Sequence, residues 1–341
     1  MQAPDPYQPP CTLSSSILAL VAAIAEISGR VSSLTAPTMA PQLRRANQIR
    51  TIHASLAIEN NTLTLAQVTA VFDGKHVAGH PREIQEVRNA IVAYDGLAAW
   101  SPHSMADLLA AHKAMMAGLA NDAGAFRSGG VGVFHGGELV HMAPPARRLP
   151  SLMGDLLNWL KRTPEHPLVA GCLAHYELEF IHPFSDGNGR MGRLWQTLIL
   201  RGWRPWMAMV PVESVVRMRQ EEYYRALAEA DTRADAAPFV EFMLAALLEA
   251  VQDSLPTDQV SDQVSDQVLR LMQALVAGPR RASDLMTQLG LAHRPTFRRN
   301  YVDPALRDGW IERTQPESPR SPTQSLRLSD KGWMRLDQQA G

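Results

Sequence analysis

The stretch that decides the fold of this chain runs from His182 to Arg193 and reads HPFSDGNGRMGR. An apolar run from Leu168 to Ile181 precedes it and is long enough for a buried helix. Helical spacing of apolar residues follows it, from Arg190 to Leu200. The sequence therefore predicts a helix, a tight loop and a second helix, with the loop opening at the N-terminus of the second helix.

This loop carries the groups that a bound polyphosphate needs. Glycines let the backbone approach a ligand closely, and the first amides of a helix point outward without intrahelical partners. Arginines add forked donors for phosphate oxygens. Asp186 offers a hard oxygen ligand for Mg²⁺, and His182 can act as a base near neutral pH. The arginines concerned are Arg190 and Arg193.

Two other binding loops contain similar residues, and both fail on spacing. In an EF-hand, Gly189 at position six would place Phe184 at position one and Trp195 at position twelve, where calcium needs carboxylates. A phosphate loop of the Gly-Lys-Ser/Thr type fails as well, because no lysine follows these glycines. His-Pro-Phe or Gly-Asn-Gly alone would be an ordinary helix end or turn, so only the whole stretch indicates this chemistry.

The whole stretch resembles the signature of the Fic (filamentation induced by cAMP) family, His-Pro-Phe-x-Asp/Glu-Gly-Asn-Gly-Arg-x-x-Arg, with every position filled. The resemblance implies an enzyme that moves AMP from Mg-ATP onto a protein Ser, Thr or Tyr hydroxyl and releases pyrophosphate. It implies that His182 deprotonates the target hydroxyl, Asp186 binds Mg²⁺ and Arg193 reaches the γ-phosphate. By the same resemblance, the other phosphate-holding residues are Gly187, Asn188, Gly189 and Arg190. Phe184 would anchor the loop in the core. Family members that phosphorylate carry Lys where Gly189 stands, so this chain's glycine favours AMP transfer.

A second motif lies upstream, at the end of a helix expected from about Pro41 to Glu59. Asn60 suits a left-handed helix C-cap, and Thr64 with Gln67 predicts a capping box for the next helix. A carboxylate at a helix C-terminus is unfavourable unless a cation answers it. The spacing of Ser55, Glu59 and Asn60 resembles the family's inhibitory motif, whose glutamate pairs with the second arginine of the signature. The resemblance therefore implies autoinhibition through a pair between Glu59 and Arg193.

A β-hairpin is predicted between Gly124 and Pro145, where β-forming residues flank Gly136 and Gly137. In the family this place holds a flap that lays the target segment over the active site by strand addition. Arg127 is expected to brace the hairpin rather than to contact substrate. His135 and His141 lack further ligands at metal-binding spacing, so no metal is expected there.

The remaining polar residues of the predicted helices belong to no short motif. By resemblance, the neighbourhood of Tyr224 and Arg225 approaches the adenine and ribose, although no short motif marks a base pocket. The charged residues expected to make a solvated helix face are Glu83, Glu86 and Arg88. Glu177 and Glu179 are expected to be helix-facing charges rather than catalytic acids.

The composition changes at Thr257–Val268, a four-residue repeat whose apolar face predicts a connecting helix. Beyond it, three helical segments and a hairpin resemble a winged-helix domain. Its basic residues could bind DNA phosphates, or they could be the solvated face of a docking or dimerisation module, and few base-reading side chains accompany them. The arginines concerned are Arg294, Arg298, Arg299, Arg313 and Arg320.

Bulk properties limit the class of protein. A net charge of -1 over 341 residues gives no global attraction to nucleic acid or membrane. Cys11 and Cys172 suggest no disulfide framework, which fits a reducing compartment. The chain starts without a basic leader, and the apolar run from Ile17 to Ala25 is too short to span a bilayer. We therefore expect a soluble, cytoplasmic protein without membrane partners.

The expected fold is mainly α: a Fic-fold helical bundle with a β-hairpin flap, followed by a C-terminal winged-helix domain. The expected regions are an N-terminal part, 1–120, with the inhibitory helix at about 41–60, a catalytic core, 121–255, and a last part, 256–341, in which 266–341 could bind DNA. The expected function is a protein adenylyltransferase that also labels itself. A nucleotide-sensing DNA-binding regulator and a reversible enzyme that also removes AMP are the alternatives. The target protein and a homodimer stay open.

Overall fold

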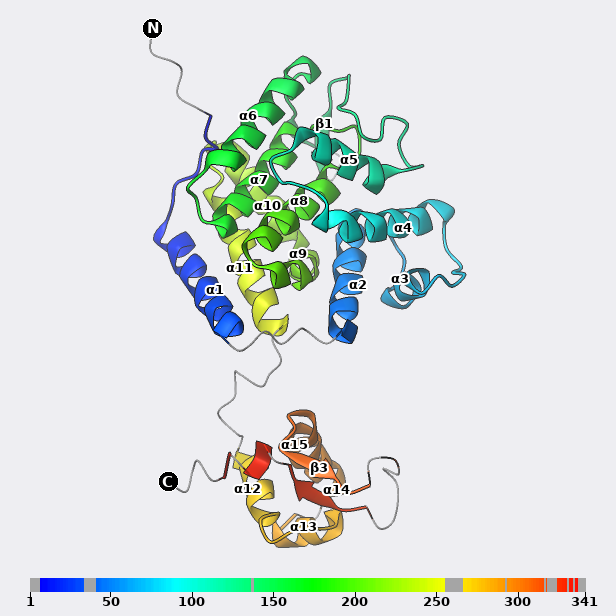
Figure 1. Cartoon of the computed structure of the whole chain (residues 1–341), viewed down its shortest axis with the longest axis vertical. Helices are drawn as coiled ribbons and strands as arrows, with labels where there is room; N and C mark the ends of the chain where they lie inside the picture. The colour runs from blue at the N-terminus through cyan, green and yellow to red at the C-terminus, as the bar shows by residue number, and fades with distance from the viewer. Residues whose placement is uncertain are drawn as a thin grey trace. The chain divides into compact units, whose positions relative to one another are not determined.

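In this computed structural model the chain divides into two compact units, Met1–Ser254 and Leu255–Gly341. Both are mainly helical, as expected (Figure 1). None of the described helices combines the length and low polarity that crossing a bilayer requires. The structure describes residues 7–33, 41–135, 138–254, 266–291, 293–315, 317, 324–329, 331–333 and 335–336.

The first unit is a helical bundle with one hairpin. In chain order its described elements, apart from short 3-10 turns, are α1 (Ser15–Ser33), α2 (Pro41–Ile58), α3 (Leu65–Phe72), α4 (Pro81–Asp95), α5 (Met105–Met116), β1 (Gly132–His135), β2 (Glu138–Met142), α6 (Leu149–Arg162), α7 (Pro167–Ile181), α8 (Asn188–Trp203), α9 (Val212–Met218), α10 (Gln220–Arg233) and α11 (Ala237–Ser254).

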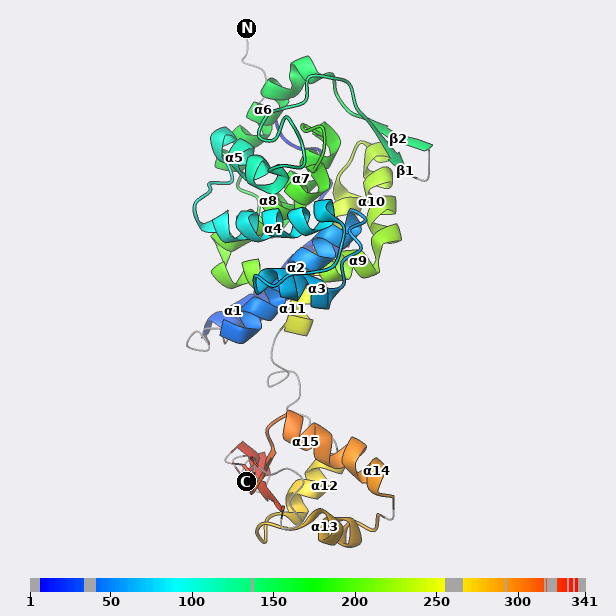
Figure 2. The ribbon, with the colours of Figure 1, turned by 90° about the vertical axis from the view of Figure 1, so that its right-hand side faces the viewer.

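Helices α7 and α8 pack side by side at the centre of this unit and carry the signature loop between them (Figures 1 and 2). Residues 168–178 of α7 are all buried, and α8 is buried almost continuously from Asn188 to Leu200. Such burial on every side explains why the sequence before the loop is apolar without a helical stripe. The predicted helix, loop and helix are confirmed, and both helices extend beyond the predicted bounds.

Helix α2 packs on α9, α3, α4 and α8, and its inward face is unusually polar. Asn47, Thr51 and Ser55 follow one another at four-residue spacing and are each almost fully buried. Buried polar groups normally have hydrogen-bond partners. Among the described residues, Asn47 Nδ2 and Thr51 Oγ1 have none. Ser55, by contrast, accepts a hydrogen bond from Arg193 Nε, and Ile58 O accepts one from Gln220 Nε2, so polar contacts help to position the end of α2.

The predicted cap at the end of α2 and the predicted start of α3 are confirmed. Asn60 has φ 68°, as a left-handed cap requires, and Thr64 forms the expected capping box with Gln67. Helix α1 continues past Gly29 to Ser33, since a glycine inside a helix costs only about 1 kcal/mol. Arg219 leaves helical geometry with ψ 36° and so separates α9 from α10.

The hairpin formed by β1 and β2 projects beside α10 in Figure 2. The strands are antiparallel, with Gly132 opposite Met142 and His135 opposite Glu138. An irregularity in the register lies between Val133 and Phe134. The predicted Gly136–Gly137 turn lies outside the described residues.

The second unit has a core of its own, built around Phe297, Tyr301 and Trp310. Strands β3 and β4 are antiparallel, with Ile311 opposite Leu328. The start of the predicted repeat helix lies outside the described residues. The described elements are α12 (Asp266–Ala274), α13 (Ala282–Gln288), α14 (Arg294–Phe297), a π-helical turn (Arg298–Val302), α15 (Asp303–Arg307), β3 (Ile311–Arg313) and β4 (Leu326–Leu328).

Candidate active site

His182 ends α7 in a left-handed conformation, with φ 49° and ψ 59°. This region is costly for a residue with a Cβ, so surrounding contacts must hold it. Arg127 supplies them: its Nε donates to His182 O at 2.7 Å, while its two other nitrogens donate to Gly129 O and Pro144 O at 2.6 Å each. Arg127 therefore joins both ends of the hairpin segment to the signature loop, which confirms its predicted bracing role.

The His182 side chain is arranged to act as a base. Its Nδ1 lies 3.2 Å from the backbone oxygen of Glu179, an acceptor, so we assign the proton to Nδ1 and the lone pair to Nε2. Burial lowers the pKa of His182, although the negative charge of Glu179 partly opposes this. The imidazole is therefore neutral at pH 7, and Nε2 can accept a proton.

The loop between α7 and α8 is closed by its own asparagine. Phe184 N donates to Asn188 Oδ1, and Asn188 Nδ2 donates to Phe184 O, both at 2.9 Å. The Asn188 side chain is therefore committed to the loop, and only its backbone amide is left to meet a phosphate. Phe184 is fully buried, which is the anchoring position expected for it.

His112 on α5 is a positioning residue that the sequence did not reveal. Its ring stacks on Phe184 with centroids 3.7 Å apart. Gly124 N donates to His112 Nδ1 at 2.9 Å, so Nε2 carries the proton and donates to Asp186 O at 3.0 Å. His112 thus holds the loop through its stacking on Phe184 and its hydrogen bond to the backbone of Asp186. Seventy-four residues separate it from Asp186, and no local pattern marks it.

Two glycines of the loop are required by their surroundings. Gly187 has φ +87°, and a Cβ there would lie 2.8 Å from Met116 Sδ. A Cβ on Gly189 would overlap Glu59 Oε1. Glycine at 187 therefore allows the turn into α8, and glycine at 189 allows the Glu59 carboxylate to approach the loop.

The structure brings Ser55, Glu59 and Arg193 together. Arg193 Nη2 lies 2.7 Å from Glu59 Oε1 and 3.0 Å from Ser55 O, while Nε donates to Ser55 Oγ at 3.0 Å. Arg193 is only 2% exposed, whereas the Glu59 side chain is 35% exposed. Burial alone would lower the pKa of Arg193, but Glu59 outweighs it and raises that pKa. Arg193 is therefore charged and fully engaged with α2.

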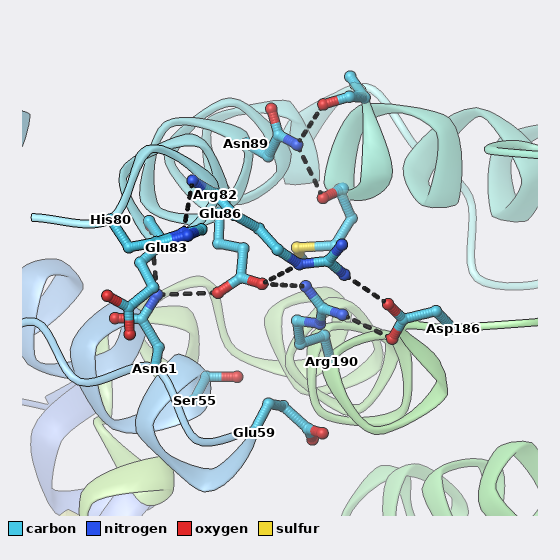
Figure 3. A network of polar contacts seen from close by, with 12 residues as sticks. Ser55, Glu59, Asn61, His80, Arg82, Glu83, Glu86, Asn89, Asp186 and Arg190 are labelled. Carbon is cyan, nitrogen blue, oxygen red and sulfur yellow. Dashed lines mark hydrogen bonds and ion pairs between the residues drawn. The ribbon is translucent and has the colours of Figure 1, made fainter. Parts of the chain in front are cut away.

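Asp186 and Arg190 belong to a second polar network, shown in Figure 3. Arg190 Nη2 donates to Asp186 Oδ1 at 2.9 Å, and Arg82 Nη2 donates to Asp186 Oδ2 at 3.1 Å. Glu86 Oε1 lies 3.6 Å from Arg82 Nε and 3.9 Å from Arg190 Nη1. Glu86 Oε2 accepts a 2.8 Å hydrogen bond from Asn61 Nδ2. The expectation that Glu86 is solvated was wrong, because its side chain is only 13% exposed.

A cavity of about 750 Å³ is lined by His182, Asp186, Glu59 and Arg193, whereas Arg190, Arg82 and Glu86 are not among its lining residues. The signature loop from His182 to Gly189, with Arg193, forms one side, and the end of α2 with Glu59 forms another. Tyr224 and Arg225 line the wall contributed by α10, where the adenine was expected. The volume falls in the usual range of small-molecule sites, about 300–1,000 Å³.

Neither glutamate before the loop is a solvated charge, since Glu177 is buried and the Glu179 side chain is only 15% exposed. Glu179 lines the cavity and accepts a hydrogen bond from Tyr223 Oη at 3.3 Å. Although burial would raise the pKa of Glu179, His175 and neighbouring positive charges hold it below its usual value. Glu177 is 4% exposed, and burial raises its pKa to about 7. Apolar neighbours in sequence could not reveal this, because α7 is enclosed on all sides.

His141 reaches into the cavity from β2. Its Nδ1 lies 2.8 Å from Asp231 Oδ2, and its Nε2 lies 2.7 Å from Phe180 O. The hydrogen bond with Asp231 raises the pKa of His141, so this histidine has the opposite tendency to His182. The side chain of His135 lies outside the described residues.

The donor set at Asp186 fits one hard divalent cation. In the part of the chain that the structure describes, no cluster of three or more His, Cys, Asp or Glu side chains could hold a metal alone. Asp186 instead offers a single half-exposed carboxylate at the start of α8. Mg²⁺ typically takes one or two carboxylates and completes its shell with phosphate oxygens and water. Such a metal could therefore bind here together with a nucleotide.

Two family patterns match the sequence. Residues 102–200 match the Fic/DOC family, and residues 266–329 match the pattern described as filamentation induced by cAMP protein Fic-like, C-terminal domain. The protein adenylyltransferase Fic of Culex quinquefasciatus is 32% identical over 218 residues, and that of Drosophila virilis is 34% identical over 216 residues. Each alignment covers 59% of this chain, which spans only 41% and 42% of these two relatives.

Solved structures agree with these matches. A crystal structure of a Fic family protein from Desulfovibrio desulfuricans G20 is 62% identical, has a TM-score of 0.72 and covers 96% of this chain and 99% of its own. Fic-1 of C. elegans, residues 134–508, is 24% identical with a TM-score of 0.54 over 70% of each chain, and this likeness shows the fold alone. The high identity to the bacterial protein over nearly its whole length leaves no other assignment: this chain belongs to the Fic family.

Proposed function

We propose that this chain is a protein adenylyltransferase. The observation that carries the proposal is one cavity that holds a neutral histidine with a free Nε2, a metal-competent carboxylate and the open N-terminus of a buried helix. In the proposed reaction, a target Ser, Thr or Tyr oxygen attacks the α-phosphorus of ATP. The bond to the β-phosphate breaks, pyrophosphate leaves, and His182 Nε2 takes the hydroxyl proton. The relatives' name, protein adenylyltransferase, supports the same activity.

The first turn of α8 is the proposed phosphate cradle. Backbone amides from Gly187 to Gly189 open onto the cavity, where the helix dipole favours negative charge. Arg190 and Arg193 supply guanidinium donors, and neither needs to leave the core to reach the loop, since both are buried beside it. Tyr224, on the wall that α10 contributes to the cavity, is the proposed neighbour of the adenine.

Asp186 is the proposed holder of Mg²⁺. When bound, the metal would neutralise phosphate charge and favour departure of pyrophosphate. His112 fixes the backbone oxygen of Asp186, so the carboxylate is presented from a rigid loop.

Autoinhibition by α2 is the proposed control of this activity. Arg193 cannot contact a γ-phosphate while its guanidinium is held by Glu59 and Ser55. ATP would then bind with its phosphates displaced and its α-phosphorus poorly aligned for attack. Release of the α2 end would free Arg193 without leaving it unpaired, because the phosphate replaces the carboxylate.

The hairpin of β1 and β2 is the proposed holder of the target segment. Strand addition uses backbone hydrogen bonds and therefore accepts varied sequences. Arg127 connects this hairpin to the backbone of His182, which would keep the bound hydroxyl in register with the base. Along the chain, we propose 1–120 as the regulatory part and 121–255 as the catalytic core.

The second unit is proposed to be a winged-helix module that either binds DNA or docks another chain. Docking of a second copy of this chain would form a homodimer. Arg294 and Arg298 are exposed, and Arg298 Nε lies 3.3 Å from Asp303 Oδ1. The Arg299 side chain and Arg320 lie outside the described residues. The free cysteines Cys11 and Cys172 support a reducing, cytoplasmic location.

Incubation with ATP labelled at the α-phosphate tests the proposal. Label should enter protein, and label at the γ-phosphate should not. Transfer of γ-label instead would indicate phosphorylation. A reversible enzyme would lose its label again when ATP is removed, and Glu59 would be required for that loss.

A further inference from the structure

Arg82, in the first turn of α4, lies against the carboxylate proposed to hold the metal (Figure 3). Its Nη2 is 3.1 Å from Asp186 Oδ2, and its Nε is 3.6 Å from Glu86 Oε1. One guanidinium thus contacts two carboxylates, that of Glu86 on α4 and that of Asp186 in the signature loop. The family signature contains neither Arg82 nor Glu86.

Both oxygens of Asp186 are engaged by arginines. Arg190 donates to Oδ1, and Arg82 donates to Oδ2. The two arginines differ in solvent exposure, because the Arg190 side chain is 4% exposed and the Arg82 side chain is 51% exposed. A hard divalent cation needs a carboxylate oxygen that is not already neutralised. Arg82 is therefore the cation that can move into solvent when a metal arrives.

Glu86 is placed to keep Arg82 after such a move. It lies one helical turn from Arg82 on α4, and it is held in place by Asn61 and by Arg190, whose Nη1 is 3.9 Å away. An arginine that loses Asp186 therefore retains a nearby negative charge. Asn61 follows the inhibitory helix directly, so the same glutamate also contacts the turn after α2.

We propose that Arg82 is a positioning residue that occupies the cation position at Asp186 and weakens binding of a free metal ion there. A metal that arrives with nucleotide phosphates competes better, because the phosphates bring negative charge and offer Arg190 new acceptors. Arg82 thereby favours loading of the metal as a nucleotide complex. This inference rests on the proposed metal-holding role of Asp186.

Titration of the full chain with Mn²⁺ in the absence of nucleotide, followed by electron paramagnetic resonance of the free ion, tests the proposal. Arg82→Gln removes the charge at similar size and should tighten Mn²⁺ binding by about threefold or more, as expected for loss of one nearby positive charge at a half-exposed position. Arg82→Lys keeps the charge and should resemble the wild type. Arg88→Gln, which removes an exposed arginine from the same helix, is the matched control and should change nothing.

Two further variants separate the possible failures. The tighter binding of Arg82→Gln should disappear in the double variant with Asp186→Asn. Unchanged or weaker Mn²⁺ binding by Arg82→Gln, even with a lowered melting temperature, would overturn the inference and leave Arg82 as a structural contact. Equal Mn²⁺ affinity in wild type and Asp186→Asn would instead refute the proposed role of Asp186 itself.

Discussion

Substitution of Glu59 by glycine should activate this protein. The change removes the carboxylate that lies 2.7 Å from Arg193 and leaves the rest of the cavity in place. Arg193 keeps its two contacts to Ser55, so the guanidinium stays beside the loop. In the presence of ATP the lost carboxylate is replaced by a phosphate, and no buried charge is orphaned.

The size of the effect follows from the exposure of the pair. A hydrogen bond to a charged group contributes about 1.5–3 kcal/mol, and the 35% exposure of Glu59 places this pair toward the lower half of that range. Since about 1.4 kcal/mol corresponds to a factor of ten, a bias of about 1.5 kcal/mol, the lower end of that range, would reduce the competent fraction by about tenfold. We therefore expect Glu59→Gly to raise the initial rate of self-labelling by about tenfold or more.

The assay is a time course of protein labelling with α-labelled ATP and Mg²⁺. Glu229→Gln is the matched control, because it removes a carboxylate from an exposed ion pair with Arg233 on α10. Its rate should equal that of the wild type. Equal rates for wild type and Glu59→Gly would refute the inhibitory reading and make Glu59 an ordinary helix end.

Four further predictions test other parts of the account. His182→Ala should reduce AMP transfer by about 10²–10⁴-fold while nucleotide affinity, measured by calorimetry, stays near wild type; normal labelling would remove His182 from the mechanism. Because burial lowers the pKa of His182 below its ordinary 6.5, the base is neutral at pH 7, and the rate of Glu59→Gly should fall only as the pH drops below that value; a decline beginning above pH 7 would contradict this. Arg217→Ala removes a 2.5 Å hydrogen bond to Ala57 O at the end of α2 and should raise self-labelling severalfold, about 1 kcal/mol of lost restraint, whereas an unchanged rate would show that this contact does not hold the helix. If the second unit binds DNA, affinity of the full chain for duplex DNA should fall steeply between low and high salt, and absence of binding at low salt would favour docking.

The parts of the fold that sequence could predict are those decided by local chemistry. The left-handed cap at Asn60 and the capping box at Thr64 depend on residues within a few positions of one another. The helix, loop and helix around His182 follow from apolar runs interrupted by glycines. The pairing of Glu59 with Arg193 could be expected only through the family resemblance, because 134 residues separate them.

The contacts that escaped prediction join distant segments through polar side chains. Glu86, Glu177 and Glu179 each occupy helix positions that would suit a solvated charge, and only tertiary packing decides that they are enclosed. Arg82 reaches Asp186 across 104 residues. Such pairs leave no periodic signal, since a charged residue has the same sequence pattern whether it meets water or a partner.

Intact-mass spectrometry of Glu59→Gly incubated with Mg-ATP tests the central claim most directly. We expect a population whose mass has increased by one AMP moiety for each modified hydroxyl, and no such population when His182→Ala is added to the same variant. An increase equal to a phosphate group would contradict AMP transfer, and an AMP adduct that persists without His182 would contradict the proposed mechanism.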